Sequence, residues 1–185
     1  VLGELALWMA LPVAIWGMVL GFIAGRKERG DLALGAERSG YVLFVLTLIA
    51  SLGVIDTFVN DRFEYRYVAN YSSVNLETFY KVSGLWAGQT GSLLFWALLL
   101  GFFSSICVFT NRNKHREFMP YVAGVLQTIL FFFIFGAVLI ARVALIGEIS
   151  YRAWLYGAIL GLLVWLGLFV LVVNAVMFWL TIWIS

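Results

Sequence analysis

The sequence predicts an all-α polytopic integral membrane protein with about five transmembrane helices, and we treat residues 1–185 as a single transmembrane helical region. Its residues are 63% hydrophobic and 12% charged. Soluble domains are about half apolar and about a quarter charged, so this composition excludes a soluble protein. The apolar residues form continuous runs without two-residue alternation, which favours membrane helices over a barrel.

Five apolar runs contain the roughly 20 helical residues that a bilayer core requires. We place these spans at Leu5–Ala24, Tyr41–Val59, Gly91–Phe109, Met119–Ala141 and Trp154–Ile184. The last run is long enough for one tilted helix, for a helix that continues beyond the membrane, or for two pieces. The acidic Glu4 precedes the first run, where a cleaved signal peptide has basic residues, so we expect a transmembrane helix there.

Lysine and arginine residues predict the orientation of these spans. They are dense in the ranges 26–29 and 112–116 and thinly spread elsewhere. Because cytoplasmic loops carry an excess of positive charge, both clusters are predicted to be cytoplasmic. The N-terminus and the Trp86 loop, residues 60–90, are then extracytoplasmic. The clusters have no phosphate-binding loop beside them, so we expect them to contact membrane lipid and not nucleic acid.

The junction between the 60–90 loop and the third span is the candidate binding site. It consists of Trp86, Gly88, Gly91, Ser92 and Trp96. Tryptophan is suited to the headgroup region of a membrane, and glycine allows a backbone or a flat ligand to come close. A simpler interpretation also stays open, in which the tryptophans form an aromatic belt and Ser92 caps the third helix.

The order of residues across this loop is specific. It contains, in sequence, Tyr67, Val68, Ala69, Ser72, Tyr80, Lys81, Trp86, Gly88, Gly91, Ser92, Leu94 and Trp96. The order and spacing resemble the CcmF haem-lyase family of bacterial cytochrome c maturation, whose loop has the form Tyr-Val-Ala-x-x-Ser, then Tyr-(Lys/Arg), then Trp-Gly-Gly-x-x-Gly-Ser-x-Leu-x-Trp. Ala87 replaces the first glycine of the family pair.

The resemblance implies a bacterial inner membrane protein that handles haem and takes part in its covalent attachment to apocytochrome c at the outer face. Haem would be the cofactor, and a haem-delivering chaperone and apocytochrome c, or its thiol-holding partner, would be the protein partners. On this interpretation Trp86 and Trp96 stack on a porphyrin, and backbone amides are exposed at Gly88 and Gly91. Basic side chains of the loop, namely Arg62, Arg66 and Lys81, are candidates for contact with haem propionates, and the interpretation that they are simple loop charges is equally open.

The alternative is a non-catalytic membrane subunit or a small-solute channel element with an aromatic docking loop. Whether the chain is itself an enzyme stays open, because catalytic residues and axial haem ligands are not identified in it. Cys107 and His115 are the single cysteine and histidine, so no metal site is predicted. The histidine-bearing segments of the family are missing, and residues 142–185 do not align with it. The chain is then part of a longer protein, one piece of a naturally split protein, or a shortened relative with a different function, and we favour the first explanation.

Few polar residues lie within the predicted spans. Asp56 is expected to be an interfacial carboxylate near the end of the second span. Hydrogen bonds between helices are expected for Gln127, Thr128 and Asn174. The small-xxx-small pairs Gly17/Gly21 and Gly157/Gly161 are expected to permit close helix approach.

Overall fold

The computed structural model describes residues 2–27, 29–111 and 116–146, and these residues are helical with short connections. The elements are α1 (Leu2–Lys27), α2 (Gly30–Val59), α3 (Arg66–Tyr71), α4 (Thr78–Ser83), the 3-10 turn η1 (Gly84–Trp86), α5 (Gln89–Asn111) and α6 (Met119–Ile146). No strand occurs in the described ranges. The predicted all-α fold class is therefore confirmed.

Four helices, α1, α2, α5 and α6, are long and apolar enough to cross a membrane. They correspond to the first four predicted spans, which confirms a polytopic membrane protein. The fifth predicted span, Trp154–Ile184, lies outside the described residues. The chain divides into two compact units, Val1–Ala141 and Arg142–Ser185, and the first unit contains α1, α2, α5 and α6 as far as Ala141.

Helix α2 begins at Gly30, well before the predicted start at Tyr41. Its first turns are rich in good helix formers, and the Arg29 guanidinium binds the Asp31 carboxylate at 2.7 Å in the first turn, where a negative charge is favourable. At 1.5 Å per residue its 30 residues extend about 45 Å, which exceeds a hydrocarbon core of about 30 Å. Most of the basic loop predicted before Tyr41 is therefore helical.

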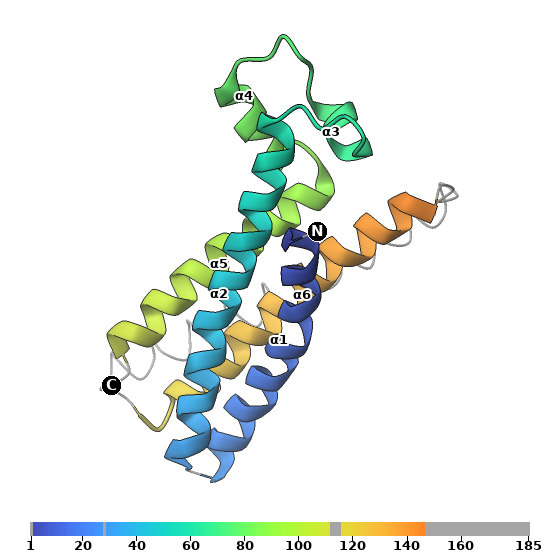
Figure 1. Ribbon diagram of the computed structural model, residues 1–185. Helices are drawn as coiled ribbons and strands as arrows, with labels where there is room; N and C mark the ends of the chain where they lie inside the picture. Colours follow the sequence, from blue (N-terminus) through green and yellow to red (C-terminus); the bar gives the residue numbers. More distant parts are fainter. Residues whose placement is uncertain (1, 28, 112–115, 147–185) are drawn as a thin grey trace, which may run out of the picture. The chain divides into compact units, whose positions relative to one another are not determined.

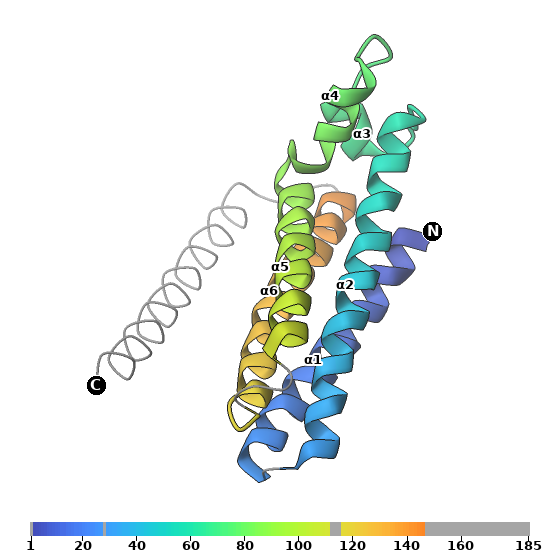
Figure 2. The same cartoon turned by 90° about the vertical axis from the view of Figure 1, so that its left-hand side faces the viewer.

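The helices of the first unit pack as a bundle (Figures 1 and 2), in which α2 contacts both α1 and α5. The turn between α1 and α2 and the start of α6 lie at one end, and α3 and α4 lie beyond the other end of α2. The central core contains the fully buried residues Ala10, Ala14, Leu43, Ala97, Leu130 and Ile134. Small residues on α1 allow the larger side chains of α2 and α6 to fill the centre.

Helices α1 and α6 approach each other closely at glycines. A Cβ atom added to Gly21 would lie 2.7 Å from both the Cα and the N atom of Gly124. One turn to either side, Gly17 faces the Gln127 side chain and Gly25 faces the ring of Tyr121. The close approach predicted for the Gly17/Gly21 pair is confirmed, whereas the Gly157/Gly161 pair lies outside the described residues.

Gln127 links α6 to α2 through buried hydrogen bonds. Its Nε2 donates to the Ala36 carbonyl at 2.7 Å, and its Oε1 accepts from Ser39 Oγ at 3.0 Å. The interhelical bond predicted for Gln127 is confirmed. The prediction is wrong for Thr128, because its hydroxyl donates to the Gly124 carbonyl within α6. Asn174 lies outside the described residues.

Candidate functional site

The predicted 60–90 loop is a compact set of short helices, and Tyr67 on α3 lies at its centre. The Gly88 N–H donates to the Tyr67 hydroxyl at 3.1 Å, and this hydroxyl donates to the Gly84 carbonyl at 3.1 Å. Burial raises the pKa of the Tyr67 phenol above its ordinary value, so the group stays protonated and able to donate. One phenol thus bonds to the backbone before and after Trp86.

Aromatic rings hold Tyr67 in this position. Its ring packs edge-on against Phe58, with ring centroids 5.5 Å apart, and Phe58 at the end of α2 is fully buried. On the same face of α3, Tyr71 lies with its ring centroid 5.1 Å from that of Tyr67. Gly84 packs directly against the Phe58 ring, where no side chain would fit. The end of α2, helix α3 and turn η1 therefore form one packed unit.

The two glycines of the candidate site make room for these rings. A Cβ atom on Gly88 would lie 2.7 Å from the Tyr67 ring and 2.8 Å from the Tyr71 ring. A Cβ atom on Gly91 would collide with the Leu85 carbonyl and the Tyr67 hydroxyl. Both glycines are buried. The prediction of an exposed amide is therefore wrong for Gly88, because its N–H is bonded to Tyr67.

Trp86 and Trp96 lie at the surface, with exposed fractions of 47% and 55%. Phe95 lies between them, with ring centroids 5.4 Å from Trp86 and 6.3 Å from Trp96. We name Trp86, Phe95 and Trp96 the aromatic face. The structure thus places the two predicted tryptophans on one continuous aromatic surface at the start of α5.

Ser92 does not cap α5. The helix begins at Gln89, so Ser92 is already inside its first turn. Its hydroxyl donates to the Trp86 carbonyl at 3.0 Å, and its N–H donates to the Gly88 carbonyl. The expected cap is therefore wrong, because the helix starts earlier than the apolar run indicates. Ser92 instead fixes the backbone of Trp86 from the side of α5.

Lys81 on α4 is buried and binds Asp61 with a distance of 2.5 Å between Nζ and Oδ2. The expectation that Lys81 meets haem propionates is therefore wrong, because its charge is neutralised inside the loop. Arg62 is exposed and lies 3.5 Å from Asp56 in the last turn of α2, where an interfacial carboxylate was predicted. Arg66 is also exposed.

The described residues provide no group of three histidine, cysteine, aspartate or glutamate side chains that could hold a metal ion. Cys107 is half-buried near the far end of α5. His115 lies outside the described ranges. Aromatic surface and bonded backbone, and not metal ligands, thus make up the described site.

Known proteins are similar to this chain in sequence and in fold. No protein-family model matches the chain. The chain is 36% identical over 108 residues to the cytochrome c-type biogenesis protein NrfE of Haemophilus influenzae, a match that covers 58% of the chain and 17% of the relative. It is 32% identical over 129 residues to the cytochrome c-type biogenesis protein CcmF of Pseudomonas aeruginosa, a match that covers 69% of the chain and 20% of that relative. The solved structure of the cytochrome c haem lyase CcmF superposes with a TM-score of 0.65 at 26% identity, covering 72% of this chain and 22% of that one.

The chain belongs to the CcmF family. It spans about a fifth of the length of the curated relatives that it matches, between 16% and 20% in each case. The resemblance given by the loop motif and the membrane fold are therefore both confirmed. The roles of Trp86, Gly88, Gly91, Ser92 and Trp96 in ligand binding stay predictions.

Tyr67 is the residue whose role sequence reasoning missed. It belongs to the family motif, yet its contacts with residues 84–91 depend on how α3 folds over the start of α5. The available signal was the spacing of Tyr67 and Tyr71, which lie four residues apart and share one face of a short helix.

Proposed function

We propose that this chain serves cytochrome c maturation and that its aromatic face handles haem at the outer surface of the bacterial inner membrane. Membership of the CcmF family supports the process. The observation that carries the assignment of the site is the pair of exposed tryptophans, Trp86 and Trp96, with the half-buried Phe95 ring between them. Tyr67 and Ser92 hold this surface at the loop-to-helix junction.

The chemistry of this surface suits a porphyrin. A porphyrin is flat and largely apolar, and stacked aromatic pairs contribute about 0.5–1.5 kcal/mol each beyond the burial of their area. The backbone on both sides of Trp86 is hydrogen-bonded, to Tyr67 and to Ser92. Binding would therefore order few groups that are mobile in the free protein, which favours affinity.

The described residues fit a surface on which haem stacks, and they do not fit a site that ligates the iron. Neither histidine nor cysteine occurs between residues 60 and 96. In the proposed reaction the vinyl groups of haem are joined to the cysteine thiols of a Cys-x-x-Cys-His segment of apocytochrome c. The role of this chain is to position one reactant beside the other, which raises their effective concentration.

The proposed orientation places the N-terminus and the 60–90 loop outside the cytoplasm. Its support is the separation of charge along the bundle: Arg29 and Arg116 lie at the end where α1 meets α2 and α6 begins, and the aromatic face lies towards the opposite end. A haem-delivering chaperone and apocytochrome c would then both approach from the side of the aromatic face. Membrane lipid surrounds the four spans.

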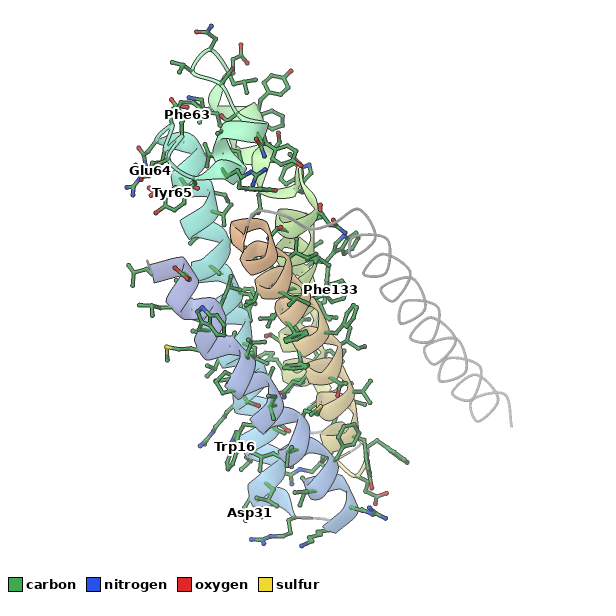
Figure 3. The ribbon with its side chains drawn as sticks, turned by 90° about the vertical axis from the view of Figure 1, so that its right-hand side faces the viewer. Trp16, Asp31, Phe63, Glu64, Tyr65 and Phe133 are labelled. Carbon is green, nitrogen blue, oxygen red and sulfur yellow. The ribbon has the colours of Figure 1, made fainter. Side chains whose placement is uncertain are left out.

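The test uses Trp86→Phe and Trp86→Ala in the full-length protein, with covalent haem staining of cytochrome c measured per amount of membrane protein. Both variants are expected to lower the yield of holocytochrome c, Trp86→Ala more strongly, because stacking area is lost in two steps. The matched control is Trp16→Ala on α1, which removes a tryptophan that is 63% exposed and remote from the loop (Figure 3).

Normal yield in both Trp86 variants would contradict the proposal. The aromatic face would then be a membrane anchor or docking surface, as in the alternative of a non-catalytic subunit or small-solute channel element. A loss of yield in the Trp16 variant as well would show a general effect of tryptophan removal on membrane insertion, and would equally remove the support for a haem surface.

A further inference from the structure

Helix α2 ends in a turn that is usually completed by glycine. The Asp61 N–H donates to the Phe58 carbonyl at 3.3 Å and the Arg62 N–H donates to the Thr57 carbonyl at 3.0 Å, which is the paired pattern of a Schellman motif. Asp61 has a φ of 50°, a left-handed conformation that glycine adopts without steric cost. In the described ranges it is the one non-glycine residue with a positive φ. Glycine would end the helix at least as well, so the carboxylate at this position requires another explanation.

The Asp61 carboxylate joins the end of α2 to α4. Its Oδ2 accepts a hydrogen bond from Lys81 Nζ at 2.5 Å, across 20 positions of the sequence. Lys81 is 8% exposed, and lysine is seldom buried unless its charge is paired. The other carboxylate oxygen, Oδ1, is buried and has no hydrogen-bond partner within the described part of the chain. A left-handed backbone and a buried ammonium group thus meet in one contact, which places α4 against the end of α2.

Hydrogen-bonded backbone connects this contact to Trp86. Helix α4 ends at Ser83, and η1 begins at the next residue. The Gly84 N–H donates to the Lys81 carbonyl, and the Ala87 N–H donates to the Gly84 carbonyl at 3.3 Å. Lys81 and Trp86 therefore belong to one short stretch of helical backbone, so a displacement of Lys81 would also displace Trp86.

We propose that Asp61 is a positioning residue for Trp86. By binding Lys81, it fixes the position of α4 and η1 relative to the end of α2. Tyr67 and Ser92 bond to the backbone beside Trp86 from α3 and α5, and Asp61 adds a charged contact from the end of α2. The consequence for haem rests on the proposed function, whereas the position of Trp86 can be measured without haem.

Fluorine NMR of the full-length protein labelled with fluorotryptophan tests this role. The Trp86 resonance is assigned by its loss in Trp86→Phe, and the Trp16 resonance by its loss in Trp16→Ala. Asp61→Gly removes the carboxylate and provides the residue best suited to the left-handed turn. Lys81→Met removes the ammonium group and keeps a long apolar side chain. Both variants should shift or broaden the Trp86 resonance and leave the Trp16 resonance of α1 unchanged.

Hydrogen exchange measures the size of the effect. Loss of a charge-assisted hydrogen bond should make exchange in residues 84–92 about tenfold faster in Asp61→Gly. Residues 54–60 should exchange at the wild-type rate, because glycine preserves the end of α2. The matched control is Glu64→Gln, which removes an exposed carboxylate of the same loop (Figure 3) and should change neither measurement. The yield of holocytochrome c is measured in parallel and should fall in Asp61→Gly and Lys81→Met.

An unchanged Trp86 resonance in both single variants would overturn the inference. The double variant Asp61→Gly/Lys81→Met leaves neither charge unpaired, so it should fold and still shift the Trp86 resonance alone. If the single variants disturb every tryptophan and the double variant restores all resonances, the pair contributes to stability only, and the inference is again overturned. A shifted Trp86 resonance with a normal yield of holocytochrome c would support the inference and contradict the proposed function, so the two can fail separately.

Discussion

Two regions of the molecule depend on closely packed glycines, and they use them differently. At the crossing of α1 and α6, Gly21 meets the backbone of Gly124 and Pro120. At the junction between the loop and α5, Gly88 meets the rings of Tyr67 and Tyr71, and Gly84 meets the ring of Phe58. In the first region helix meets helix, and in the second a turn meets aromatic side chains.

The difference lies in what can move. Backbone atoms of a packed membrane helix cannot shift without separating the two helices, whereas aromatic rings can change rotamer at a smaller cost. We therefore expect the crossing to determine whether the bundle assembles. The packing at the junction should determine whether Trp86 is held in its position on the aromatic face once the bundle has assembled.

The largest effect is expected from Gly21→Ala at the crossing. Its methyl group would meet Gly124 at 2.7 Å, and such overpacking costs about 1–3 kcal/mol. The midpoint of thermal unfolding in detergent and the amount of protein in the membrane should both fall. Gly30→Ala is the control, because a Cβ atom there meets no atom within 4 Å. Equal stability of the two variants would contradict the distinction between the regions.

Tyr67→Phe should have a smaller and local effect. It removes the acceptor of the part-buried Gly88 N–H, and the loss of one such hydrogen bond costs about 0.5–1.5 kcal/mol. Hydrogen exchange should accelerate in residues 84–92 and stay unchanged in α1 and α6, with a parallel loss of haem attachment. The control is Tyr65→Phe, an exposed tyrosine of the same loop. Faster exchange throughout the bundle would show that the junction is not a separate unit.

The smallest effect is the dependence of the junction on alkaline pH. Burial raises the pKa of Tyr67 in the folded protein, so the fold favours the protonated phenol. Its contribution is complete below the ordinary tyrosine pKa of about 10 and is lost as the pH rises through the higher folded value. Exchange in residues 84–92 should therefore accelerate in that window more in the wild type than in Tyr67→Phe.

Hydropathy alone predicted the four described spans, because a bilayer demands about 20 apolar residues per helix whatever the packing. It did not predict that α2 begins at Gly30, because the first turns of that helix are polar and stabilised locally by Arg29 and Asp31. Hydropathy reports where a helix enters the hydrocarbon core and is insensitive to helix that continues outside it.

The sequence predicted which residues form the candidate site, but it did not predict how they pack against one another. Trp86 and Trp96 lie at the surface, as a binding role requires. Gly88 and Gly91, however, both accommodate Tyr67, and these contacts arise only because residues more than 20 positions apart in the sequence come together. Substituting a larger residue for Gly88 would disturb this packing with or without a ligand. Changes at the aromatic face itself therefore test the proposed haem contact more directly than changes at Gly88.

The buried pair of Lys81 and Asp61 bears on how the proposed ligand would reach the aromatic face. Residues 60–90 contain three basic residues, Arg62, Arg66 and Lys81, and three acidic residues, Asp61, Glu64 and Glu77, so the loop has no net charge. Without a net field there is no long-range steering, and encounter rates stay near the about 10⁵–10⁶ M⁻¹s⁻¹ of neutral pairs. Capture at the aromatic face should then depend on short-range contact and vary little with ionic strength.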